Sequence, residues 1–314
     1  MASPAAGLRG IDPSAFRLRH EAEEAADGDV VGLEAVLADL DREIRPFGRR
    51  RAPYAAWRAR GLVGGFRWDH EDSRTAEWYP QGVAASPDGR VLLASWYRKS
   101  TNEARVSVVD TLARRYRHLG LVTAGLAPVR SHAGGLAWCE DVLYVADTST
   151  GLRHFDLGRI LRTADGYALP EAGRYRSAGG GLRFSYASVD HAAGALLVGQ
   201  YRDKAAGARL VRWPLAAGGL LAQEEATGAW VTAHPNLQGA AVVDGRVMLA
   251  RSRGRYRAGI LYVSPFAEQA EERRWAVGGE DLAAAGSELV SLCEHPDLPW
   301  PLARRRAVFR ASVR

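Results

Sequence analysis

Five segments of the chain repeat one plan, and this repetition limits the fold more than any other feature of the sequence. In each segment, a short strand of small residues leads through a turn into a strongly apolar strand that ends in polar or aromatic residues. The segments read QGVAASPDGRVLLASWYR, GGLAWCEDVLYVADTS, FSYASVDHAAGALLVGQYR, QGAAVVDGRVMLARSR and EDLAAAGSELVSLCEHP. Their starts lie 53, 50, 54 and 42 residues apart, close to the roughly 40 to 50 residues of a four-stranded propeller blade. The repeats predict an all-β chain folded as a five-bladed β-propeller.

A third strand follows each of these pairs, and a weaker fourth usually follows the third. The fifth repeat differs, because the sequence stops after its third strand, RAVFRASV. A blade without its outer strand would expose a sheet edge. GLVGGFRW, residues 61–68, is the only strand-like segment before the first repeat. We therefore predict that this N-terminal strand closes the ring and that the propeller spans residues 61–314.

Residues 1–60 lack the repeat, and we predict that they form an N-terminal helical extension and linker. IDPSAFRLRHEAEEAA has Asp12 and Pro13 at a helix start, and VVGLEAVLADLDREI has apolar residues at helical spacing. We expect two helices that cap the bottom or the rim of the propeller. A lid over its mouth and a homodimer contact through these helices are the alternatives.

Composition limits the environment and the partners. The first residues show no apolar run of signal-peptide length, and no stretch approaches the roughly 18 apolar residues of a membrane span, so we expect a cytoplasmic protein without a membrane partner. The two cysteines, Cys139 and Cys293, are too few for a disulfide framework. The net charge is +6 and nearly all of the positive charge is arginine, but no reading helix or zinc finger accompanies it. We therefore expect no nucleic-acid partner.

The first residues of the inner strands, and the loops after the second strands, are expected to meet at the upper mouth of the channel. A small-molecule site needs broad aromatic surface and a few convergent polar groups, and these positions supply both. The predicted substrate-binding residues are Trp78, Tyr79, Gln81, Trp96, Tyr97, Arg98, Tyr186, Tyr201, Arg202, Gln238, Arg251, Asp281 and His295. The alternative is structural: such residues also hydrogen-bond one another and ordered water along a channel, or pack neighbouring blades.

Two residues are candidates for catalysis, Glu280 and His132. Glu280 is the only carboxylate among the five inner-strand starts, and enclosure by aromatic residues would raise its pKa and prepare it to exchange protons. His132 is the candidate to assist or orient it. Calcium ligation by Glu280, Gln81, Gln238 and Asp281 is an alternative, but one or two carboxylates make a weak cage. We expect neither a metal nor a cofactor, and the sequence has no GxSxG, HExxH or P-loop motif.

Several motifs resemble a group of actinobacterial five-bladed propeller proteins, many of which carry secretion signals. They are WYPQG, HAGGLAW followed by LYVADT and FDL, LQGAAVVDG, and EDL followed by ELVSLCEHP, and the resemblance spans about residues 76–314. This chain has helix-like residues where those members have the signal. The resemblance implies the fold but no settled activity.

Three classes of function fit these features. The first is a biosynthetic enzyme of specialised metabolism, a cyclase in which Glu280 acts as acid and base in a cyclisation or condensation. Its loose analogue is strictosidine synthase, a six-bladed propeller that performs a Pictet-Spengler reaction with a glutamate. The substrate would be aromatic, and anionic if Arg98, Arg202 and Arg251 bind it. The alternatives are a non-catalytic protein that binds a sugar or small molecule, and a metal-dependent lactonase-like hydrolase similar to gluconolactonase.

Overall fold

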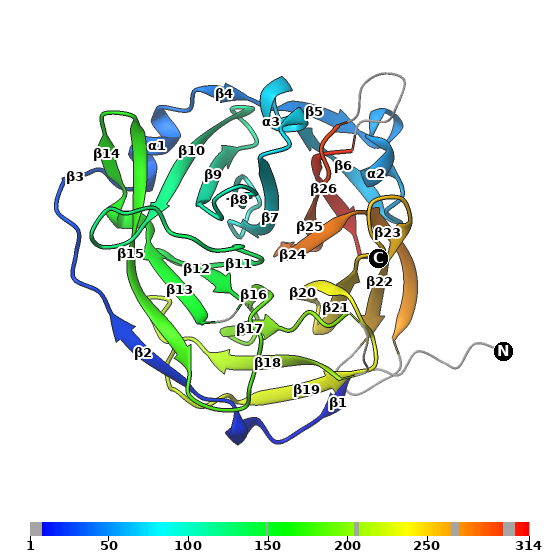
Figure 1. Cartoon of the computed structure of the whole chain (residues 1–314). Helices are drawn as coiled ribbons and strands as arrows, with labels where there is room; N and C mark the ends of the chain where they lie inside the picture. The colour runs from blue at the N-terminus through cyan, green and yellow to red at the C-terminus, as the bar shows by residue number, and fades with distance from the viewer. Residues whose placement is uncertain (1–7, 149, 204–206, 265–269, 298–304, 314) are drawn as a thin grey trace.

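The centre of the molecule is surrounded by a ring of short inner strands (Figure 1). The computed structural model describes residues 8–148, 150–203, 207–264, 270–297 and 305–313. The inner strands are β7 (Trp78–Ala85), β11 (Leu136–Cys139), β16 (Tyr186–Asp190), β20 (Leu237–Val243) and β24 (Gly279–Ala285). Each contacts the next around the ring, and β24 contacts β7. The chain is therefore an all-β protein with β-propeller architecture.

From each inner strand, further strands pair outward in antiparallel order. The series are β8 (Val91–Arg98), β9 (Ala104–Asp110) and β10 (Arg115–Val122); β12 (Val142–Asp147), β13 (Gly151–Asp156) and β15 (Gly166–Ser177); β17 (Ala195–Gly199), β18 (Ala208–Pro214) and β19 (Gly228–Thr232); β21 (Arg246–Arg251), β22 (Ala258–Ser264) and β23 (Glu271–Val277); and β25 (Glu288–Cys293), β26 (Ala307–Ser312) and β6 (Leu62–Arg67). Strand β15 also runs parallel to β10, which joins two of the series into one sheet. Apolar side chains between neighbouring sheets form the core.

The strand predicted at residues 61–68 is present as β6, and it pairs antiparallel with β26, which confirms that prediction. Two glycines allow the close approach. A Cβ atom at Gly65 would lie 2.2 Å from the carbonyl oxygen of Val308, and one at Gly64 would lie 2.8 Å from that of Phe47. Side chains at these positions would collide with backbone on both neighbouring strands, so the glycines make β6 a narrow strand that fits between them.

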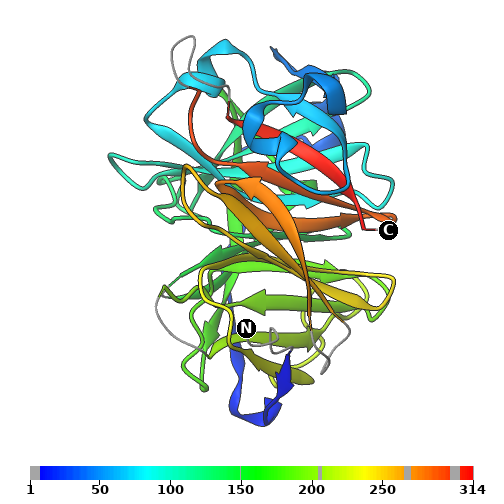
Figure 2. The ribbon, with the colours of Figure 1, turned by 90° about the vertical axis from the view of Figure 1, so that its right-hand side faces the viewer.

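Residues 9–48 form a belt around the rim of the propeller (Figure 1). Its short strands are β1 (Arg9–Gly10), β2 (Leu18–Ala22), β3 (Asp29–Val30), β4 (Arg42–Glu43) and β5 (Arg45–Gly48), which pair with β19, β15, β14 (Leu161–Thr163), β10 and β6 respectively. Helix α2 (Tyr54–Trp57) packs against β23. Figure 2 shows the first belt strands at one end of the molecule and the helices near residue 55 at the other. Each outer strand therefore has a neighbour from the N-terminal segment.

The expectation of two N-terminal helices is only partly met. Residues after Asp12 form a single 3-10 turn, η1 (Pro13–Ala15), and then strand β2 where the first helix was expected. Only Leu18 of β2 is buried, so this stretch has no apolar stripe with which a helix could dock. The edge of β15 offers its backbone hydrogen-bond partners instead. The second expected helix is present but shorter, as α1 (Gly32–Ala38), with Val36 buried.

The remaining helices are short. They are α3 (His70–Arg74), η2 (Arg49–Arg51) and η3 (Leu157–Arg159). No helix in the described part of the chain has both the length and the apolar character needed to cross a membrane. The predicted division at residue 60 stays a prediction, since the belt strands are paired with the sheets of the later residues.

Candidate functional site

Three inner strands are irregular at the predicted mouth residues. The antiparallel register shifts beside Gln81 in β7, beside Gln238 in β20 and beside Glu280 in β24. A β-bulge re-aims the side chains of the residues that it inserts, and bulges are common next to active sites. The irregularities therefore explain how three separate strands can direct two amide groups and a carboxyl group toward one cluster.

Glu280 faces a second carboxyl group, that of Glu294, which directly follows β25. Glu280 is 3% exposed and the side chain of Glu294 is 21% exposed. Gln81 Nε2 donates to Glu294 Oε2 at 3.2 Å, and the amide of Gln238 hydrogen-bonds Glu280. Among the described residues, Glu280 Oε1 has no hydrogen-bond partner. The pair is thus held from two sides, and one of its oxygens, Glu280 Oε1, is buried without a partner among the described residues.

Burial prevents both carboxyl groups of the pair from being charged together at low cost. Loss of solvation raises the pKa of Glu280 well above its usual range, and the charge of Glu294 and a hydrogen bond between the two carboxyls raise it further. Burial also raises the pKa of Glu294, but Gln81 and the charge of Arg306 oppose that rise. Glu294 therefore loses its proton first, and the pair titrates as a unit with Glu280 as its acid.

Arg306 holds the backbone of Glu294 in place. This arginine is fully buried, and its Nε and Nη2 donate to the carbonyl oxygen of Glu294 at 3.0 and 2.8 Å. Its Nη1 donates to the carbonyl oxygens of Asp72 and Thr75 at 2.6 and 3.1 Å. Burial lowers the pKa of Arg306 to about 10, so the guanidinium still carries its charge at neutral pH. It fixes the backbone that carries the pair and biases Glu294 toward its ionised form.

Tyrosine rings lie near this cluster. The rings of Tyr79 and Tyr97 lie 5.8 Å apart, and the ring of His132 lies 4.3 Å from that of Tyr97. Burial, together with the charge of Glu294, raises the pKa of Tyr97 to about 12. Burial and the charges of Asp203 and Glu280 raise the pKa of Tyr201. Tyr97 and Tyr201 therefore stay protonated at neutral pH and offer both flat apolar surface and hydroxyl donors.

Both predicted histidines are neutral at physiological pH. His295 is buried, with Nδ1 3.4 Å from Glu294 Oε1; burial and three nearby arginine charges lower its pKa to about 4. Desolvation and the charge of Arg183 lower the pKa of His132. The His132 ring is tilted by 41° against that of Tyr97, and the residue is exposed. Its predicted assistance to Glu280 would therefore act through the tyrosine.

Two further predicted residues serve the packing of the channel. Asp281 is fully buried, and its Oδ2 accepts the backbone N–H groups of Val83 and Leu136 at 3.2 and 2.9 Å. It thereby ties β24 to β7 and β11. Tyr186 is also buried, and its ring covers Gly199, where a Cβ atom would lie 1.8 Å from the ring. Both residues therefore have the structural role that was predicted as the alternative to substrate binding.

The other predicted residues lie in the walls and on the rim. The Trp96 ring is fully buried, with Nε1 donating to Ser107 Oγ at 2.7 Å, which leaves no surface for a ligand. Trp78 lies under the guanidinium of Arg105 at 4.3 Å. Arg98 forms ion pairs with Glu77 and Glu103 at 3.7 and 3.4 Å. Arg251 donates to the Tyr262 hydroxyl at 3.2 Å, whereas Arg202 is exposed. The three predicted anion-binding arginines are therefore not equivalent, because two of them are engaged.

The side-chain oxygen atoms near Glu280 can be compared with the ligands that calcium needs. Within the described residues, no group of three or more His, Cys, Asp or Glu side chains is arranged to hold a metal ion. Of the oxygen atoms that the calcium hypothesis invokes, Asp281 Oδ2 is already engaged, because it accepts the backbone N–H groups of Val83 and Leu136. The residues present fit a proton-transfer site better than a cation cage.

Replacing Glu280 with glutamine is expected to raise the melting temperature at neutral pH by a few degrees. The unfolded carboxyl titrates near 4.5, and the folded pKa is raised. Its contribution to stability is therefore fully present below about pH 4.5 and is lost as the pH rises toward the folded pKa. Glutamine is neutral throughout, so the gain should shrink to nothing near pH 4. Thermal melts across this range check the prediction, and Glu77→Gln on the exposed rim should show no such trend.

Comparisons with known proteins do not assign a family. No family model matches the chain, and no curated protein shows significant sequence similarity to it. One similar solved structure is Kuenenia stuttgartiensis hydrazine synthase, which is 12% identical over 78% of this chain, with a TM-score of 0.41. The match covers 66% of the hydrazine synthase chain, just under two thirds of its length. Another is a calcium-binding protein, regucalcin from Agrobacterium tumefaciens, which is 14% identical over 74% of this chain and 89% of that chain, with a TM-score of 0.38. The Swd1 β-propeller domain from Myceliophteria thermophila is 12% identical over 95% of this chain and 100% of that domain, with a TM-score of 0.38. Likenesses this distant assign neither a family nor an activity.

Proposed function

We propose that this protein is a small-molecule enzyme that moves protons with the Glu280–Glu294 pair. The observation that carries the proposal is a buried carboxyl pair of unequal acidity with one unpartnered oxygen, placed among half-buried tyrosines. Structural carboxylates are usually paired with cations or fully hydrogen-bonded, whereas opposed carboxyl groups with raised pKa values are typical of acid–base catalysis.

The pair can serve as acid and base in a single reaction. Glu280 holds a proton at neutral pH and can deliver it to a leaving oxygen, while ionised Glu294 can accept a proton from the reacting carbon. The hydrogen bond between the carboxyls then returns the proton from Glu294 to Glu280. No other proton donor is needed, and the pair ends the cycle as it began.

The reaction class that uses this sequence of transfers is a condensation with loss of water followed by ring closure, as in a Pictet-Spengler cyclisation. An amine and an aldehyde condense, Glu280 protonates the departing hydroxyl, and Glu294 removes the ring proton after the carbon–carbon bond forms. Tyr79, Tyr97 and Tyr201 support an aromatic substrate, since flat rings stack on tyrosine. The assignments to specialised metabolism, to five blades centred on the five inner strands, and to the resembled actinobacterial group belong to this proposal.

A panel of arylethylamines, each paired with aliphatic and aromatic aldehydes, tests the proposed function. Products are detected by mass spectrometry after borohydride reduction, because the ring-closed product keeps the mass of the two reactants minus water whereas the uncyclised imine, which has the same mass, gains two hydrogens. The expected result is product formation above the uncatalysed rate with at least one pair. Saturable binding of the same amines without any product would favour the non-catalytic binding protein. Hydrolysis of lactones that stops on addition of a chelator would favour the metal-dependent alternative.

A further inference from the structure

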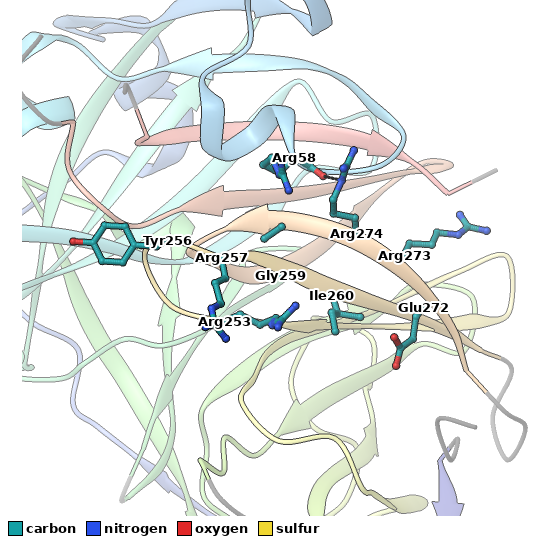
Figure 3. Close-up of a pocket in the computed structure, with 10 residues that line it drawn as sticks. Arg58, Arg253, Tyr256, Arg257, Gly259, Ile260, Glu272, Arg273 and Arg274 are labelled. Atoms are coloured by element: carbon teal, nitrogen blue, oxygen red, sulfur yellow. Dashed lines mark hydrogen bonds between the residues drawn. The ribbon is translucent and has the colours of Figure 1, made fainter. Parts of the chain in front are cut away.

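A cavity lies beside β22 and β23 (Figure 3), and none of its lining residues belongs to the carboxyl-pair cluster. It has a volume of about 600 Å³ and is bounded by Arg58 at the end of α2, by the loop that joins β21 to β22, and by β22 and β23. This volume lies within the range of small-molecule sites in proteins, roughly 300 to 1,000 Å³. The cavity is therefore large enough for a ligand of small-molecule size.

Arginine dominates the lining. The cationic residues are Arg58, Arg253, Arg257, Arg273 and Arg274, and they face a single lining carboxylate, that of Glu272. Figure 3 shows Arg58 and Arg274 on one side, Arg253 and Arg257 on the other, and Gly259 between them. Guanidinium groups that approach from opposite walls repel one another unless an anion lies between them.

Most of this charge is not neutralised within the described part of the chain. Arg273 is engaged, because it forms two hydrogen bonds with Glu271 at 2.9 and 3.0 Å. Arg58, Arg253 and Arg257 form no ion pair with a described residue. Arg274 donates its Nε to the carbonyl oxygen of Arg58 at 3.1 Å. In addition, Arg58 Nε is buried without a hydrogen-bond partner among the described residues, which is the state expected of a donor that awaits an acceptor.

We propose that this cavity binds a small molecule that carries a chain of two or more phosphoryl groups. Arginine forks match phosphoryl oxygens, and each arginine can form two parallel hydrogen bonds with them. Opposed guanidinium walls suit several linked anionic groups better than one carboxylate, which could satisfy only one wall. Tyr256 lines the same cavity and is 72% exposed, with the guanidinium of Arg305 over its ring at 5.3 Å. The base of a nucleotide could stack on the part of the ring that Arg305 does not cover.

Titration calorimetry of the full chain with sodium tripolyphosphate tests the site. We expect saturable binding that weakens as salt is added. The double variant Arg58→Gln, Arg253→Gln removes one guanidinium from each wall and should weaken binding by about 100-fold, since a charge-assisted hydrogen bond contributes about tenfold or more. Arg257→Gln alone changes one exposed side chain and should weaken binding about tenfold without altering the melting temperature.

The matched control is Arg130→Gln, Arg159→Gln, which removes the same charge from exposed positions outside the cavity. It should change affinity by less than about threefold. Equal weakening in the control and cavity variants, or no binding by the parent chain, would overturn the proposal. A parallel titration with a nucleoside triphosphate distinguishes a nucleotide ligand from a bare phosphoryl chain. If the triphosphate binds more tightly than tripolyphosphate and Tyr256→Ala abolishes this difference, the ligand is a nucleotide. If the two bind equally, the site recognises the phosphoryl chain alone. Either of these results supports the polyphosphate site.

Discussion

Turnover is expected to fall by on the order of 100-fold or more when Glu280 is replaced by glutamine, while substrate binding survives. Glutamine keeps the size and hydrogen-bonding capacity of the side chain but removes the proton that the buried pair keeps at neutral pH. The loss should therefore appear in kcat more than in KM. Steady-state kinetics on the first active substrate pair, with ligand binding measured separately, check this result.

Two companion variants sharpen the test. Glu294→Gln should also lower kcat, and it should abolish the acidic limb of the pH–rate profile, because Glu294 is the group that must be ionised. Glu24→Gln alters an exposed carboxylate of the N-terminal belt and should leave turnover unchanged. Parent-level turnover in Glu280→Gln would remove the catalytic role from Glu280. A joint loss of bound metal and thermal stability would instead identify a calcium ligand, because a bound ion stabilises only the folded state.

Deletion of residues 1–68 is expected to yield aggregated protein. The deletion removes β6 from β26 and also the belt strands from β19, β15 and β10, so apolar sheet edges become available to other chains. Size-exclusion chromatography and thermal melts monitored by circular dichroism measure the outcome. A soluble product that unfolds cooperatively would show that the ring does not need its N-terminal strand.

A pair of glycine variants in the full chain tests the same closure without deletion. Gly65→Ala places a Cβ atom 2.2 Å from the Val308 carbonyl oxygen and should destabilise the fold by about 1 to 3 kcal/mol, as overpacking does. Gly10→Ala changes a glycine in the edge strand β1, but the added Cβ meets nothing within 4 Å. The control should therefore melt close to the parent. Equal melting of the two variants would contradict tight packing of β6 on β26.

The repeats were sufficient to predict the β architecture because each carries the apolar alternation of a strand pair at nearly constant spacing. The closing strand was predictable for a related reason, since an incomplete last repeat requires a partner. The belt was not predictable in this way. Its strands have two to five residues, and their conformation is set by the edges they meet rather than by their own pattern.

The site was predictable only in part. Glu280, Gln81 and Gln238 stand at inner-strand starts, but the bulges that direct them toward one cluster leave no mark in the sequence. Glu294 carried a usable signal, because it ends a second strand next to predicted His295. Arg306 carried none: it lies in a run of three arginines, and its burial distinguishes it from Arg305, which is partly exposed. Trp96 shows the opposite error, since an aromatic residue at a strand end can face the wall as readily as the mouth.

The belt also implies an order of events during synthesis. Residues 9–48 leave the ribosome before any of the outer strands that they pair with, and strands of two to five residues are not stable alone. Phe66 must likewise wait for Val308, its partner far along the sequence. Bringing such distant segments together has a high entropic cost, so the closing step should be slow and should follow completion of the chain. Nascent chains that stall before β26 would present unpaired sheet edges, which makes translation speed and chaperone access determinants of yield for this protein.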